Sequence, residues 1–322
     1  MAPIFVQQEA PPSPPPDTAT VTVHALSAGH LTLPEGHFVY PSSATARNTV
    51  PSLSFLIQHD NPSTGNPTRI VFDLGLRRDV NRYSEPIRRH AATREPLATQ
   101  PDVVKSLAKG GLTPDDIDYV IYSHVHWDHI GEPRDFTHST FVVGHGATDL
   151  LHGTSTALRG GHSFFEPDLL PPDRTIELSD PKRAQKEPGP HEPGMLDLNQ
   201  PWTSLGHLPR TMDVFQDGSL YIVDAPGHLP GHVNLLATTE LGQQIYLAGD
   251  ACHDRRIMTG EREIGEWRDA EGQVCCIHAD RREAEETIER IRRLEGQGVE
   301  VIFAHDVEWE GNELNQGRFW GV

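Results

Sequence analysis

The sequence predicts an α/β fold in which two β-sheets pack against each other and helices cover their outer faces. Short apolar runs typical of buried strands recur along the chain, at 53–58, 70–72, 117–122, 141–143, 220–223, 233–238, 245–248 and 299–304. Helical patterns interrupt them twice, at 101–109 and 283–294. The resulting order is strands, helix, strands, then strands, helix, strand. It indicates two similar halves, each of which supplies one sheet.

Local patterns support the individual elements. Residues 20–26 alternate apolar and polar side chains, as a half-buried strand does. The helix over 101–109 is followed by two glycines that favour its end. The helix over 283–294 has a single apolar stripe at helical spacing, formed by Ala284, Ile288, Ile291 and Leu294.

The chain has 322 residues, which suffices for one large domain. Residues 1–18 are rich in proline, with five prolines between positions 8 and 18, and are expected to form a disordered tail. The domain is expected over 19–322. Within it, residues 153–210 are rich in proline, glycine and polar side chains and are interpreted as an insertion or long loop that could lie over the site.

Composition excludes several classes of partner. There are 46 acidic against 27 basic residues, so the net charge is −19. Nucleic acid and anionic membranes are disfavoured, because both attract basic surfaces. The three cysteines have no C-x-x-C spacing and suggest no disulfide framework. No signal peptide or transmembrane segment is recognised, which favours a cytoplasmic protein.

The most informative motif is His124-Val-His-Trp-Asp-His129, which follows the apolar strand at 117–122. Side chains at 124 and 126 point to the same side of a strand. Asp128 and His129 can turn towards a second centre from the loop beyond it. Imidazole and carboxylate are the ligands that Zn²⁺ accepts when no thiolate is offered. The motif therefore predicts zinc and hydrolytic chemistry.

Three further candidates border apolar strands: His232 precedes one, while Asp250 and His305 each follow one. Taken singly, each is as consistent with a structural role as with metal binding. Together with the motif they make a set of seven, which is enough for two metals with one open, water-filled position. The predicted ligands are His124, His126, Asp128, His129, His232, Asp250 and His305.

The motif, the later Pro-Gly-His-x-Pro-Gly-His run at 226–232, the Gly-Asp pair ending at Asp250 and the strand-terminal His305 resemble the metallo-β-lactamase superfamily. Their order and spacing are most similar to its N-acyl-homoserine lactonase-like branch. Asp73-Leu-Gly75 matches an early Asp-x-Gly of the superfamily, and 305–308 resembles the same region of bacterial lactonases. The resemblance covers roughly residues 20–310 and implies an αββα sandwich.

The resemblance also implies roles for the ligands and a cofactor of two Zn²⁺ ions per chain, with Fe, Mn or Co as other candidates. One metal would be bound by His124, His126 and His232, the other by Asp128, His129 and His305. Asp250 would bridge them. His228, the first histidine of its motif, is expected in a turn or beside a ligand. Asp73 is expected to orient a ligand without touching metal.

Two features depart from that branch. The insertion at 153–210 is longer and more polar than in the short bacterial lactonases. The branch has a catalytic tyrosine three residues after the bridging aspartate, and this chain has His253 there. His253 could donate a hydrogen bond or a proton to the substrate; alternatively, the polar role is lost and the substrate differs. Asp128 and His253 are the candidate catalytic residues.

The implied reaction is attack of a metal-bridging hydroxide on a carbonyl carbon, which opens a small lactone or lactam ring. Alternatives are a lactamase or cyclic carbamate hydrolase that detoxifies a xenobiotic, a glyoxalase-II-like thioesterase, and a degenerate protein that only binds a ligand. The branch resemblance favours a homodimer. Aromatic residues that could line a substrate pocket are Trp127, Phe164, Phe165, Trp202 and Trp309.

Overall fold

The computed structural model of the chain describes residues 19–61, 65–156, 164–183 and 194–322. The tail predicted over 1–18 lies outside these residues, as does part of the predicted insertion. Within the described ranges, no helix is both long and apolar enough to cross a bilayer.

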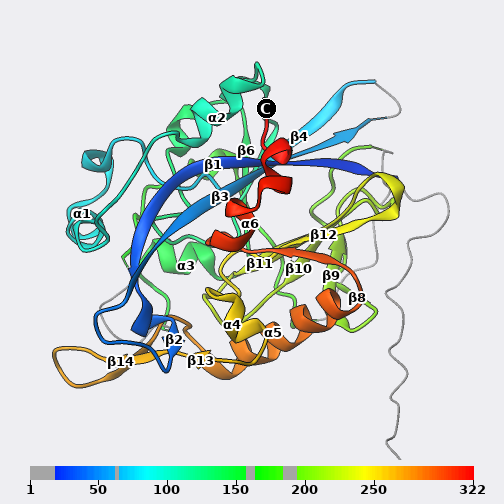
Figure 1. Cartoon of the computed structure of the whole chain (residues 1–322). Coiled ribbons are helices and arrows are strands. Elements are labelled where there is room, and N and C mark those ends of the chain that lie inside the picture. The colour runs from blue at the N-terminus through cyan, green and yellow to red at the C-terminus, as the bar shows by residue number, and fades with distance from the viewer. Residues whose placement is uncertain (1–18, 62–64, 157–163, 184–193) are drawn as a thin grey trace, which may run out of the picture.

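Two six-stranded sheets form the centre of the molecule (Figure 1). The first has the order β1 (Val21–Pro34), β3 (Arg47–Asp60), β4 (Pro67–Phe72), β5 (Tyr119–Ile121), β6 (Thr140–Val143) and β7 (Thr175–Glu177). The second has the order β16 (Glu300–Ile302), β12 (Gln244–Leu247), β11 (Val233–Thr238), β10 (Leu220–Asp224), β9 (Leu208–Asp213) and β8 (Thr203–Leu205).

Helices cover the outer faces of both sheets, so the predicted αββα sandwich is confirmed (Figure 1). Residues of α1 (Glu85–Ala92) and α2 (Val103–Lys109) pack with the first sheet, and those of α5 (Arg281–Gly296) pack with the second. Three short helices, α3 (Ala147–Leu151), α4 (Arg255–Met258) and α6 (Val307–Gly311), complete the set. Two small sheets pair β2 (Val39–Tyr40) with β13 (Glu263–Ile264) and β14 (Glu266–Arg268) with β15 (Val274–Cys276).

The core has two layers because side chains alternate along each strand. On β3, Phe55 and Ile57 belong to a cluster that also holds Ile222 and Leu235 of the second sheet, which places that cluster between the sheets. Leu56, between them in sequence, packs outwards in a second cluster that includes residues of the helices. The two sheets thus share one apolar interface.

Helix α5 confirms the predicted element over 283–294 and extends it by two residues at each end. Asp280 caps it by accepting a hydrogen bond from the backbone N–H of Glu283, at 2.9 Å. Its predicted stripe is buried: Ala284, Ile288, Ile291 and Leu294 are at most 3 % exposed. The amphipathic pattern predicts this helix correctly because its apolar stripe packs on the second sheet.

The stretch 153–210 contributes to both sheets. It holds β7 and β8, which are the edge strands of the two sheets, and the start of β9, which pairs with β8 and β10. Leu169, Leu198 and Trp202 are buried against the core. The polar composition of this stretch reflects its exposed edge positions, since edge strands pair on one side only.

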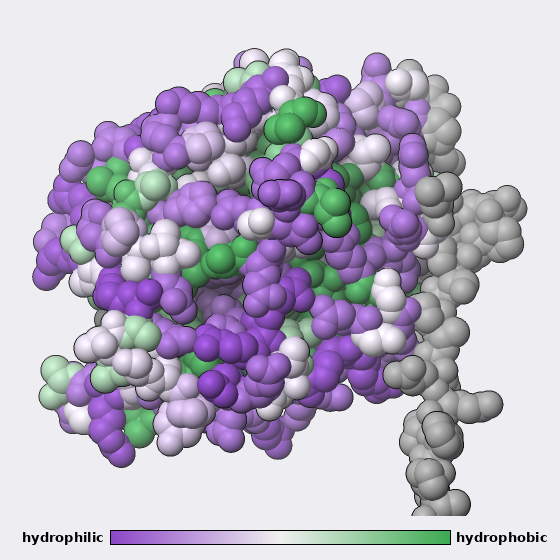
Figure 2. Space-filling model, in the orientation of Figure 1, coloured by the Kyte–Doolittle hydropathy of each residue, from purple (hydrophilic) through white to green (hydrophobic). Residues whose placement is uncertain are grey.

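The many charged residues of the sequence predict a mostly hydrophilic surface. The face drawn in Figure 2 is mostly hydrophilic, with hydrophobic residues scattered over it. Isolated apolar side chains of this kind are normal on a soluble surface and need no partner.

Candidate metal centre and active site

The candidate site lies where five strands end. Asp73 follows β4, the motif 124–129 follows β5, His228 follows β10, Asp250 follows β12 and His305 follows β16. These strands come from both sheets, so the site bridges the two halves of the sandwich. Each strand is held by its neighbours, and the side chains just beyond its end are therefore held on rigid supports.

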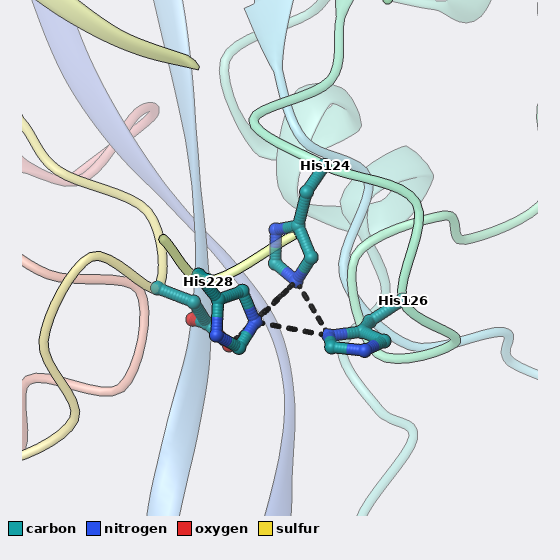
Figure 3. A group of neighbouring side chains, drawn as sticks. His124, His126 and His228 are labelled. Carbon is teal, nitrogen blue, oxygen red and sulfur yellow. Dashed lines mark hydrogen bonds and ion pairs between the residues drawn. The ribbon is translucent and has the colours of Figure 1, made fainter. Parts of the chain in front are cut away.

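Three histidines form the first cluster (Figure 3). Nε2 of His124 lies 2.9 Å from Nδ1 of His126 and 3.2 Å from Nε2 of His228, and the last two atoms are 3.0 Å apart. Oδ2 of Asp250 is 3.5 Å from Nε2 of His228. Ring nitrogens that converge in a triangle cannot all donate to one another. Their convergence is typical of ligands around a cation.

A second cluster joins Asp128, His129 and His305 to the other oxygen of Asp250. Oδ1 of Asp250 lies 3.2 Å from Nε2 of His129 and 3.3 Å from Nε2 of His305. Nε2 of His305 is also 3.6 Å from Oδ2 of Asp128. Asp250 therefore faces both clusters, one oxygen to each.

Two buried atoms of this cluster are positioned as ligands of a cation. Nε2 of His129 and Oδ1 of Asp250 are buried, and neither has a hydrogen bond of good geometry within the described part of the chain. Buried polar atoms of this kind are costly unless paired. A divalent metal among them would satisfy both, so the donor set suits one metal in each cluster.

His228 occupies the position that the sequence analysis assigned to His232. Nδ1 of His232 donates to the carbonyl of Ala225 at 3.1 Å, and its Nε2 accepts from the backbone N–H of Asp250 at 3.1 Å. Both ring nitrogens are thus used within the protein. The structure places the ring of His232 behind Asp250 and brings His228 to His124 and His126.

Neighbouring groups orient the clustered rings. Asp73 accepts from the N–H and hydroxyl of Ser123, both at 2.7 Å, and from Nδ1 of His129 at 2.9 Å. Nδ1 of His305 donates to the carbonyl of Pro51 at 2.7 Å. Such contacts settle which nitrogen of each ring faces the cluster. Asp73 lies where the predicted orienting role requires it.

Burial favours the neutral form of two histidines in the first cluster. It lowers the pKa of His124 and of His228 well below the ordinary value of histidine, because a buried imidazolium loses its hydration. For His129, burial acts in the same direction, but the charges of Asp250 and Asp73 outweigh it and raise its pKa well above that value. Neutral imidazole is the form that binds metal.

His253 and His278 lie beside the first cluster. Nε2 of His253 is 3.0 Å from Oδ2 of Asp250. The ring of His278 lies 5.2 Å from that of His228 and 5.4 Å from that of His253, measured between centroids. Nδ1 of all three rings is buried with no hydrogen-bond partner among the described residues. The three histidines form a third group of potential metal ligands.

His278 is not among the site residues that the sequence predicts. It follows the small strand β15, whose residues Val274–Cys276 carry no apolar pattern that marks a buried strand end. Burial lowers its pKa well below the ordinary value of histidine. Only the tertiary structure brings it to the site.

A cavity of about 470 Å³ opens onto the two clusters. Asp128, Asp250, His253 and His305 line one part of it. Aromatic side chains line other parts, namely Phe38, Trp127, Phe164 and Trp267, and two arginines, Arg47 and Arg94, also contribute. Its volume is in the range of small-molecule sites.

Two of the five aromatic residues predicted for the pocket, Trp127 and Phe164, line this cavity. Phe165 stacks on the ring of His126, with 6.1 Å between centroids. The structure places the other two elsewhere. Trp202 packs between the sheets and donates to the carbonyl of Ser179, and Trp309 packs in the same cluster and donates to Glu300.

Comparison with protein families matches residues 47–305 to the model described as the metallo-beta-lactamase superfamily. A cytochrome P450 monooxygenase, mpaDE′ of Penicillium brevicompactum, is 26 % identical over 319 residues. The match covers 92 % of this chain but only 35 % of that protein, so the chain spans about a third of its length.

Two shorter matches carry names that specify a ring. Gamma-lactamase FDB1 of Fusarium pseudograminearum is 28 % identical over 249 residues, 74 % of this chain and 55 % of that protein. N-acyl homoserine lactonase AttM of Rhizobium radiobacter is 29 % identical over 154 residues, 47 % of this chain and 46 % of that protein.

A solved structure shares the fold. It is an N-acyl homoserine lactone hydrolase with the product N-hexanoyl-L-homoserine bound at its catalytic metal centre. Its TM-score is 0.63 at 19 % identity, over 91 % of this chain and 96 % of that one. The predicted resemblance to lactonase-like proteins is confirmed at the level of the fold and of the relatives.

Proposed function

Because the chain belongs to the metallo-beta-lactamase superfamily of metal-dependent hydrolases, we propose that it opens a small cyclic ester or amide with two zinc ions. The observation that carries the proposal is the placement of Asp250, whose two oxygens face two separate clusters of histidines. A single carboxylate between two such clusters is the arrangement that holds two metals together.

We assign the ligands from the geometry. His124, His126 and His228 would hold one metal and Asp128, His129 and His305 the other, with Asp250 shared between them. When bound, the pair supplies Lewis acidity and a water of lowered pKa. Zinc is the default for these donors, and Fe, Mn or Co would accept the same set.

The protein's own groups would position the substrate and move its protons. The aromatic walls of the cavity would hold the apolar body of the substrate, with its carbonyl towards Asp250. Asp128 lines the cavity and is placed to accept the proton that the attacking water loses. His253 lines the same cavity, and in this proposal it would donate a hydrogen bond to the leaving oxygen or nitrogen.

A lactam or cyclic carbamate is the second candidate substrate. The similarity to a protein named gamma-lactamase supports it, as does His253 at the position of the tyrosine of lactonases. An amide nitrogen is a poorer leaving group than an alkoxide unless it receives a proton, and an imidazole can supply one. A thioesterase and a protein that only binds its ligand remain outcomes of the test.

The proposal predicts close to two metals per chain in the purified protein, measured by elemental analysis. Asp250→Ala should lower that number, since it removes the ligand shared by both centres. A panel of γ-lactones, γ-lactams, cyclic carbamates and linear thioesters, each followed by product formation, should show ring opening. Fast cleavage of a linear thioester without any ring opening contradicts the proposal, and so does full activity in metal-free protein.

A further inference from the structure

The cavity beside the two clusters contains an arginine, Arg94, for which the described residues supply no ion pair. Arg94 lies just beyond α1 and lines the cavity, and its side chain is half-buried. Its guanidinium makes no ion pair or hydrogen bond with any residue that the structure describes. The chain has 46 acidic residues that could pair with an arginine, yet none forms an ion pair with Arg94 in the described ranges. Because a cation that faces a cavity without such a pair is costly, we infer that a ligand pairs with it.

The backbone around Arg94 is fixed. Its carbonyl accepts a hydrogen bond from the N–H of Thr32, at 2.9 Å, which ties this segment to β1. Arg47 lies across the same segment, and its Nη2 donates to the carbonyls of Thr93 and Glu95 at 2.9 and 3.2 Å. The side chain of Arg94 therefore extends from a fixed segment of backbone, and the guanidinium of Arg47 contacts the same segment.

The surroundings of Arg94 disfavour its charge in the absence of a ligand. Burial lowers the pKa of Arg94 and repulsion from Arg47 lowers it further, while the charge of Asp128 acts in the opposite direction. Neither arginine is paired with a carboxylate within the described ranges. An anion bound at this point would relieve the repulsion between them.

We propose that Arg94, with Arg47 beside it, binds a carboxylate that the substrate carries at a distance from the ring that is opened. The planar guanidinium can donate two parallel hydrogen bonds to a carboxylate. The aromatic walls, among them Phe38 and Trp127, would pack against the apolar body between the carboxylate and the ring. The substrate class is then an acidic, partly aromatic lactone or lactam, which makes the proposed function more specific and rests on it.

The carboxylate bound by Arg94 is distinct from the one that ring opening creates. The nascent carboxylate would form at the carbonyl carbon, which the proposed function puts beside Asp250. A side-chain carboxylate is present before the reaction and should affect binding of the substrate. The two can be separated by a pair of substrates that differ only in the side-chain group.

The test uses a γ-butyrolactone with an aromatic side chain that ends in a carboxylate, and the same lactone with that group as a methyl ester. For the metal-loaded wild-type protein we expect kcat/KM to be at least about tenfold higher for the acid, mainly through KM. Arg94→Gln should abolish this preference by lowering kcat/KM for the acid to about that for the ester. Arg94→Lys should retain part of it, since lysine keeps the charge but not the paired donors.

Arg88→Gln is the matched control, because Arg88 is an exposed arginine of the preceding helix α1 and does not line the cavity. It should behave like wild type. A preference for the acid that survives Arg94→Gln would overturn the inference while ring opening still supports the proposed function.

A binding measurement distinguishes failure of the inference about Arg94 from failure of the proposed function. If the wild-type protein opens neither lactone, the proposed function fails, and calorimetry with 4-phenylbutanoate and its amide then decides the inference alone. Arg94-dependent binding of the acid supports it. Equal binding of the acid to wild type and Arg94→Gln overturns it, because that pattern assigns the carboxylate to the metals.

Discussion

At the scale of single residues, Asp250 and the groups that position it organise the site. Gly249, immediately before it, has φ +48°, and a Cβ there would lie 2.8 Å from Cβ of Ser123. The backbone can therefore pass close to Ser123 only with glycine at this position. His232 then accepts the N–H of Asp250. Both contacts set the direction in which the carboxylate leaves the chain.

The two histidines of the motif 226–232 should respond differently to substitution. His228→Ala should lower the metal content from about two to about one per chain, because His228 faces the first cluster. His232→Ala should keep both metals, but lower the free energy of unfolding by about 1–3 kcal/mol, because it leaves a buried carbonyl and a buried N–H unpaired. Elemental analysis and urea denaturation of both variants measure this. Loss of metal confined to His232→Ala would contradict the assignment.

At the scale of elements, one buried arginine fastens the cavity wall to the first sheet. Arg77, after β4, is 1 % exposed and donates to the carbonyl of Gly131 at 2.8 Å. Its Nη2 also donates to the carboxylate of Glu166 at 2.8 Å. Glu166 lies two residues after Phe164, which lines the cavity. The ion pair therefore connects the segment that begins at 164 to the strand ends that carry the site.

Removing the cation of this pair should be costly. Arg77→Met should lower the free energy of unfolding by about 3–5 kcal/mol, because Glu166 is left as a buried, unpaired charge. Arg89→Met is the matched control: Arg89 pairs with Glu85 on the exposed face of α1, and its loss should change stability by no more than about 0.5 kcal/mol. Denaturant titration compares the two. Equal effects would show that Arg77 is not a tether.

At the scale of the whole molecule, the C-terminal segment of the second half packs on the first strand of the first half (Figure 1). The N–H of Trp320 donates to the carbonyl of Ala25 on β1, at 3.0 Å, and its indole N–H donates to the carbonyl of Leu107 at 3.1 Å. His30 of β1 pairs with Glu310 of α6 at 3.0 Å. These contacts add to the apolar interface between the sheets and close the sandwich along β1.

The pair between His30 and Glu310 should make this closure dependent on pH. Its hydrogen bond to Glu310 raises the pKa of His30, while burial opposes the rise. The stabilisation is therefore fully present below the ordinary histidine pKa of about 6.5 and is lost as the pH rises through the higher pKa of the folded state. Wild type should exceed Glu310→Gln in stability by up to about 1 kcal/mol at pH 6 and by less at pH 9, by urea denaturation. A gap that widens with rising pH would contradict the pairing.

The sequence by itself determined the fold class, the strand ends that carry the site and most of its polar residues. An apolar strand followed by His-x-His-x-Asp-His is a local pattern. The side chains just beyond the end of such a strand lie at the corresponding edge of the sheet. The same holds for Asp250 and His305, each of which lies three residues beyond the end of a strand. The prediction of helix α5 also depends on local sequence alone. Its apolar stripe and the capping residue Asp280 can both be recognised without any distant contact.

Only the tertiary structure decided between His228 and His232, because both lie in one turn between β10 and β11. Gly227 has φ +124°, and a Cβ there would lie 2.2 Å from the backbone nitrogen of Ala284 in α5. The close approach of that helix thus governs the path of the turn and determines that His228 faces the first cluster. His278 and Arg94 escaped prediction for the same reason. Neither follows a local pattern, and contacts with segments distant in sequence bring Arg94 to the cavity and His278 to the first cluster.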